Sequence, residues 1–209
     1  MGPGGPSSLT PVPPRDVSPF RIGFVTGATP DKWAGVWRQR SPRDPLELVP
    51  VEQAEQEVGL RSGDLDMALV RLPIDRDGLH CIPLYDEVPV AVMSAEHVLT
   101  LLDEVSLDDL ADEQLVLPHA SGWTPSAEQL AWPPMGVGDA VEAVAGGTGV
   151  LIVPMSVARL HQRKDATYRP VVDLPTTKVG LAWLVDNEDP RVQTFIGIVR
   201  GRTERSSRG

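Results

Sequence analysis

Residues 60–73, LRSGDLDMALVRLP, decide the fold class of this chain. We expect an amphipathic helix to end at Gly63, because glycine adopts the left-handed conformation of a helix C-terminus without steric cost. The apolar run MALV at 67–70 follows a three-residue corner, and its length fits one strand buried in a parallel sheet. A helix, a corner and a buried strand form half of a βαβ unit. The stretch therefore predicts an α/β protein whose ligands bind beyond the carboxyl ends of the strands.

The residues before this stretch complete a parallel half-sheet. Strand and helix patterns alternate over residues 21–25, 30–41, 46–51, 52–62 and 67–70, beginning and ending with a strand. Thr29 is expected to cap the first helix with its hydroxyl, and Pro30 suits the first helical position.

The residues after the stretch continue the alternation. We expect strands at 79–84, 86–93, 115–118, 150–153, 168–172 and 179–185. Helices are expected near Thr124, over 137–145, after Pro154 and over 190–199. Ser106 is expected to cap one more helix, with Asp109 in its first turn.

Composition narrows the class of protein further. The chain has 209 residues, a net charge of −10 and one cysteine, Cys81. No apolar run approaches the roughly 18 residues of a membrane span, and the N-terminus lacks the pattern of a secretory signal. A single cysteine fits a reducing compartment, and the negative charge argues against non-specific binding of nucleic acid. We therefore expect a soluble cytoplasmic protein that does not bind membranes.

Six segments, in this order, carry a resemblance to a known family. They are RIGFVTGATP, LRSGDLDMALVRLP, LYDEVPVAVMSAEHVL, VSLDDLADEQLVLP, VEAVAGGTGVLIVP and VQTFIGIVR. The set resembles the effector-binding domain of LysR-type transcriptional regulators, which has the type II periplasmic-binding-protein fold. The resemblance implies two Rossmann-like α/β lobes joined by two crossover strands. Residues 20–87 with about 179–202 would form lobe I, and 88–178 lobe II, between a disordered Pro/Gly-rich leader (1–19) and a flexible tail (203–209).

The chain departs from the family pattern at its N-terminus. Family regulators carry a helix-turn-helix before this domain, whereas only 19 residues precede the first expected strand here. We therefore expect no direct DNA binding, and either a stand-alone sensor, which Met1 favours, or a fragment. Such a sensor would act through a homodimer or a heteromer with a LysR-type regulator. The expected interface consists of the helices that begin near Glu52 and Thr124.

The resemblance implies a ligand site between the lobes, for which lobe I offers four candidates. Thr26, Gly27 and Thr29 follow the first strand, where hydroxyls and free N–H groups at a helix N-terminus favour an anion. Alternatively, Thr29 serves only as a helix cap. Arg71 stands at a strand end and would pair either with an effector carboxylate or with a nearby aspartate, Asp66 or Asp75.

Lobe II offers three more candidates. Ser121 and Trp123 follow an expected strand, and the indole would either stack on a planar effector or pack against its own lobe. Thr148 lies in the sequence GGTG, which lacks the Lys-Ser/Thr of a phosphate loop and reads as a tight turn at the rim of the cleft.

Catalytic and metal sites are not expected. The four histidines, His80, His97, His119 and His161, lack metal-ligand spacing. Cys81 lies in an expected strand, without a nearby helix N-terminus to activate its thiol. The arginines at 200, 202, 205 and 208 form a basic tail that is too weak to hold nucleic acid. We therefore predict a sensor of a small anionic metabolite, without cofactor or metal. The alternatives are an enzyme or a transporter's solute-binding protein on the same fold.

Overall fold

The computed structural model describes residues 18–201, so most of the expected leader and the tail from residue 202 onward lie outside the described residues. The strands are β1 (Phe20–Val25), β2 (Leu46–Val51), β3 (Met67–Arg71), β4 (Leu79–Glu87), β5 (Pro89–Ser94), β6 (Leu151–Pro154), β7 (Ala166–Pro170) and β8 (Thr177–Leu184). The α-helices are α1 (Asp31–Arg40), α2 (Val58–Ser62), α3 (Val137–Ala145), α4 (Met155–Leu160) and α5 (Pro190–Val199). Two short 3₁₀ helices, η1 (Gln53–Glu55) and η2 (Val98–Leu101), complete the set.

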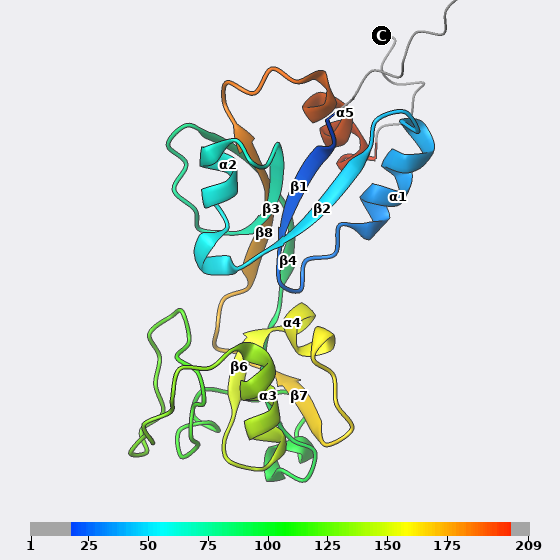
Figure 1. Cartoon of the computed structure of the whole chain (residues 1–209). Coiled ribbons are helices and arrows are strands. Elements are labelled where there is room, and N and C mark those ends of the chain that lie inside the picture. The colour runs from blue at the N-terminus through cyan, green and yellow to red at the C-terminus, as the bar shows by residue number, and fades with distance from the viewer. Residues whose placement is uncertain (1–17, 202–209) are drawn as a thin grey trace, which may run out of the picture.

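Two sheets define two lobes, one above the other in Figure 1. Lobe I is built on the five-stranded sheet β2-β1-β3-β8-β4, and lobe II on the three-stranded sheet β6-β5-β7. β1 is parallel to both β2 and β3, and all five residues of β3 are buried. The parallel half-sheet expected from residues 60–73 is therefore confirmed, as is Gly63 at the end of α2, with a φ of 77°.

The chain crosses between the sheets twice. β4 passes into β5 with only Val88 between them, and residues 171–176 connect β7 to β8. The expectation of one continuous strand over 86–93 is wrong, because β4 pairs with β8 in one sheet and β5 pairs with β6 and β7 in the other. The expected boundary between residues 178 and 179 falls inside β8, which begins at Thr177.

Lobe I has an aromatic core between its sheet and two helices. The rings of Phe20 and Trp37 are stacked with their centroids 5.1 Å apart, and Phe195 of α5 lies 6.3 and 6.0 Å from them. All three side chains are fully buried. Such rings each bury a large apolar area, so this cluster fixes α1 and α5 against β1.

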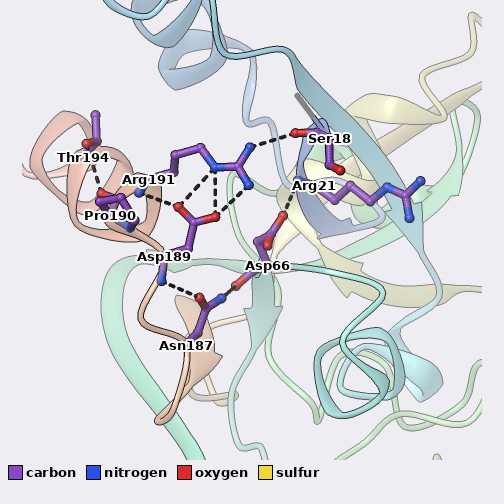
Figure 2. A network of polar contacts seen from close by, with 8 residues as sticks. All are labelled: Ser18, Arg21, Asp66, Asn187, Asp189, Pro190, Arg191 and Thr194. Atoms are coloured by element: carbon purple, nitrogen blue, oxygen red, sulfur yellow. Dashed lines mark hydrogen bonds and ion pairs between the residues drawn. The ribbon is translucent and has the colours of Figure 1, made fainter. Parts of the chain in front are cut away.

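A network of polar contacts lies at the amino end of the lobe I sheet (Figure 2). The Asp66 carboxylate accepts a hydrogen bond from the backbone N–H of Arg21 at 2.7 Å, and its carbonyl accepts one from Asn187 at 3.3 Å. Arg191 of α5 pairs with Asp189 at 2.7 Å and donates to the carbonyl of Ser18 at 2.8 Å. The aspartate of the LRSGDLDM motif therefore joins β1, β3 and the start of α5.

The expected helix over 52–62 is interrupted, and Thr29 does not cap α1. η1 and α2 are separated at Gln56, whose side chain turns inward and bonds the backbone of Arg71. α1 begins one residue later than expected, with Pro30 as its N-cap. The carbonyl of Pro30 accepts the N–H groups of Trp33 and Ala34, while the Thr29 side chain makes no hydrogen bond within residues 18–201.

Lobe II contains fewer regular elements than expected. No helix occurs near Thr124 in the described structure, where Gln129 bonds the backbone at Glu113 and Leu115 instead. The strand expected at 115–118 is reduced to a single bridge between Leu115 and Val150. Ser106 and Asp109 do exchange the expected hydrogen bonds, but the chain there forms only a turn. The helix over 137–145 is confirmed as α3.

Candidate functional site

A cavity of about 560 Å³ lies between the two lobes, at the carboxyl ends of β1 and β2. Lobe I contributes the loop after β1 and the start of α1, and lobe II contributes α4. The cavity is lined by Phe24, Thr26, Gly27, Ala28, Thr29, Asp31, Pro50, Ser156, Arg159 and Leu160. This is the sheet edge at which open α/β folds bind ligands.

Three of the seven candidates lie together in this cleft. Thr26 is half-buried and Thr29 is exposed, and neither hydroxyl has a hydrogen-bond partner in the described part of the chain. Gly27 lies between them with a φ of 88° and faces α4 of lobe II. A Cβ atom at Gly27 would lie 2.7 Å from Ser156 Oγ, so only glycine allows the loop to approach lobe II this closely.

Arg71 lies beneath the cleft in a buried ion pair. Its side chain is 3% exposed, and its Nε donates to Glu87 Oε2 at 2.8 Å. Glu87 is the last residue of β4, where the chain leaves lobe I, and it also accepts a hydrogen bond from the Ser156 hydroxyl of lobe II. Arg71 therefore pairs with neither Asp66 nor Asp75. We call Arg71, Glu87 and Ser156 the hinge network.

Two glutamines complete the surroundings of Arg71. Gln56 accepts the backbone N–H of Arg71 at 2.8 Å and donates to its carbonyl at 2.9 Å. Gln53 Oε1 lies 3.3 Å from Arg71 Nη1. The charge of Arg71 is thus balanced inside the protein by Glu87, because a buried charge needs a partner.

Ser121, Trp123 and Thr148 do not line the cleft. Ser121 bonds to His119 Nδ1 at 2.8 Å within its own turn, and burial lowers the pKa of His119. Trp123 packs against the core of lobe II, which was the alternative to stacking on an effector. Thr148 donates to the carbonyl of Ala143 at 2.6 Å and closes the turn after α3.

The residues of α4 that line the cleft were not predicted from the sequence. Ser156, Arg159 and Leu160 lie just after β6, in the same topological position as the Thr26 loop after β1. Arg159 is exposed, and its Nε donates to the Tyr168 hydroxyl at 3.2 Å. The sequence feature that could have revealed them is the helix that starts directly after the buried strand LIVP. That helix was predicted, but its residues were not assigned to the cleft.

The cleft holds one ionisable group of each sign, Asp31 and Arg159. Among residues 18–201 no cluster of three or more His, Cys, Asp or Glu side chains is placed to hold a metal ion. No helix in that part is long and apolar enough to cross a membrane. Burial raises the pKa of the Cys81 thiol, which makes it a weaker nucleophile. The lining of the cleft therefore presents hydroxyls, one carboxylate and one guanidinium.

Two α/β lobes around a hydroxyl-lined cleft define a small-molecule-binding domain. The family model described as the LysR substrate binding domain matches residues 18–204. The chain therefore belongs to the LysR substrate-binding-domain family.

Two relatives are transcriptional regulators by name. The HTH-type transcriptional regulator AlsR of Bacillus subtilis (strain 168) is 26% identical over 211 residues, covering 90% of this chain and 68% of the relative. The Hca operon transcriptional activator HcaR of Escherichia coli (strain K12) is 26% identical over 201 residues, covering 87% and 67%.

Solved structures show the same fold. The BenM effector-binding domain with its effector benzoate has a TM-score of 0.73 at 24% identity, covering 88% of this chain and 92% of that one. The reduced form of the OxyR regulatory domain from Pseudomonas aeruginosa has a TM-score of 0.69 at 21% identity, covering 87% and 96%. These matches support the two-lobed fold that the resemblance of the six sequence segments implied.

Proposed function

We propose that this domain senses a small anionic metabolite in the cleft between Thr26 and Thr29 of lobe I and Arg159 of lobe II. The observation that carries the proposal is that two hydroxyls without partners line the same cavity as an exposed guanidinium. Hydroxyls donate to anions, and a guanidinium binds a carboxylate with two parallel hydrogen bonds.

The charges of the cleft favour a ligand with a single negative charge. Arg159 of lobe II is the cation of the lining, and Asp31 of lobe I is its carboxylate. Because Asp31 would repel a second negative charge, a monocarboxylate fits better than a dicarboxylate. The side chains of Phe24, Pro50 and Leu160 add an apolar wall, which suits a monocarboxylate with a hydrocarbon or aromatic body.

Ligand binding would act through closure of the lobes. A ligand that contacts both lobes binds the closed arrangement more tightly than the open one and so shifts the population toward it. We propose that closure alters pairing of this domain with a second copy or with a LysR-type regulator, and so modulates transcription in the cytoplasm through a partner. The regulatory names of AlsR and HcaR support this role. Of the two helices proposed for that pairing, only the region near Glu52 is helical, as η1 and α2.

A thermal-shift screen with paired compounds tests the charge of the ligand. Each small monocarboxylate, from acetate to benzoate, is compared with its neutral amide. A ligand at 100 times its dissociation constant adds about 2.7 kcal/mol of apparent stability, so a bound carboxylate should raise the melting temperature while its amide should not. Arg159→Gln should abolish that difference. Amides that stabilise the protein as strongly as their acids would overturn the anionic assignment.

A further inference from the structure

A short turn of lobe II exposes three apolar side chains beside one another. In η2 and its following residue, Val98 is 68% exposed, Leu101 85% and Leu102 41%. In a 3₁₀ helix residues i and i+3 lie on the same side, so Val98 and Leu101 form one apolar surface. Single exposed apolar residues are common, but three in one turn mark a surface that is available for contact.

The exposed turn is held firmly to the lobe. His97 Nδ1 accepts the N–H of Leu99 at 3.2 Å, and His97 Nε2 lies 3.1 Å from Glu113 Oε1. The Arg169 guanidinium donates to the carbonyls of Thr100 and Leu102. A backbone fixed in this way loses little entropy when a partner binds, which favours association.

A groove adjoins the turn. It has a volume of about 790 Å³ and is lined by residues 94–98, 145–147, 164 and 165. The residues 145–147 include the last residue of α3, where the helix dipole is negative and favours a cation. Lys164 and His97 are the basic side chains of the lining, and the neighbouring Asp165 accepts hydrogen bonds from Arg163.

Exposed carboxylates outnumber the basic side chains around the turn, where Arg169 contacts the backbone and Lys164 lines the groove. The sequence contains no Lys or Arg between Arg76 and Arg159. This stretch includes η2 and the start of lobe II. Glu96, Asp103 and Glu104 flank the turn and are exposed. Carboxylates around an apolar centre attract a basic partner and orient it as it approaches.

We propose that Val98, Leu101 and Leu102, with Glu96, Asp103 and Glu104, form a docking surface for a basic amphipathic helix of a partner protein. Apolar side chains of that helix would cover Val98 and Leu101. Its Lys and Arg side chains would meet the three carboxylates and the C-terminal end of α3. Because β5 starts at the crossover and ends at Ser94, this surface lies at the end of lobe II remote from lobe I (Figure 1). It is therefore separate from the effector cleft, and its proposal does not depend on a ligand there.

The test uses a fluorescent 14-residue helical peptide of leucine and lysine in amphipathic order, titrated with the whole chain. We expect saturable binding to the wild type that weakens with salt. Leu101→Ser should weaken it about tenfold, because about 1.4 kcal/mol of apolar burial is lost. Leu130→Ser is the matched control, since Leu130 is also exposed in lobe II, at 61%. An analogue of the peptide with glutamate in place of lysine should not bind.

A second pair of variants tests the charge. Asp103→Asn with Glu104→Gln should weaken peptide binding and reduce its dependence on salt, whereas Glu128→Gln should change neither. Wild-type binding by Leu101→Ser, or equal binding of the acidic peptide, would overturn the proposal. So would sedimentation that shows a wild-type dimer converted to monomer by Leu101→Ser, because the surface would then join two copies of this chain.

Discussion

The two ends of the lobe I sheet carry polar networks of different character. At the amino end, Asp66, Asp189 and Arg191 join elements of one lobe, and the Asp189–Arg191 pair is 22% exposed on each side. At the carboxyl end, the hinge network joins the buried side chains of Arg71 and Glu87 in lobe I to the half-buried Ser156 of lobe II. The first network holds a lobe together. The second lies under the cleft, where any change in the angle between the lobes must alter it.

Because the Arg71–Glu87 ion pair is buried, breaking it should cause the largest loss of folding stability. Arg71→Met leaves the Glu87 carboxylate buried without its charged partner, and such losses cost about 3–5 kcal/mol of unfolding free energy. Urea denaturation measures this loss. The double variant Arg71→Met with Glu87→Leu should regain most of it, because no unpaired charge remains. A loss below about 1 kcal/mol in the single variant would show that the pair is not desolvated.

The network at the amino end should contribute less to the free energy of unfolding than the hinge network does. Asp66→Ala removes the acceptor for the Arg21 N–H at the start of β1, and a hydrogen bond to a charged group contributes about 1.5–3 kcal/mol. The same denaturation experiment should show a smaller loss than Arg71→Met, with ligand binding in the cleft unchanged. A loss larger than that of Arg71→Met would reverse the ranking of the two ends.

The Asp189–Arg191 pair at the amino end of the sheet should make a smaller contribution to stability, which denaturation at a series of pH values measures. Hydrogen bonds from Arg191 hold the pKa of Asp189 below its usual range, so the folded protein takes up this proton less readily than the unfolded chain. The stabilisation is complete at neutral pH and is lost as the pH falls below the ordinary carboxyl value of about 3.9. Asp189→Asn should therefore lose stability less steeply between pH 5 and pH 3, roughly the range in which carboxyls titrate. Equal slopes in both proteins would contradict this assignment.

Local chemistry made part of the structure predictable. α5 begins at Pro190, with Asp189 as its cap, and α3 ends before Gly146, so both helices carry their own start or stop signals. The segment near Thr124 also carries a start signal, Thr124 followed by Pro125, yet it is not helical. The side chains of Gln114 and Gln129 hold the backbone around it through contacts that only the folded lobe creates, so the sequence pattern alone gave the wrong prediction.

The residues of the candidate site likewise fall into those that the sequence pattern predicted and those that it did not. Thr26, Gly27 and Thr29 were identified because they follow a strand at the ligand-binding edge of the sheet. The partner of Arg71 was missed because Glu87 lies 16 residues away on another strand. Arg159 was missed because its role depends on how lobe II faces lobe I, and no pattern within α4 reveals that relation.

Calorimetric titration of Thr26→Val tests the cleft most directly. The titrant is the carboxylate that gives the largest thermal shift with the wild type. Valine keeps the shape of threonine and removes its hydroxyl, so affinity should fall by about 1.5–3 kcal/mol if a charged ligand is bound there. Ser121→Ala, which changes a hydroxyl outside the cleft, should bind as the wild type does. Wild-type affinity in Thr26→Val would mean that the ligand does not lie between the lobes.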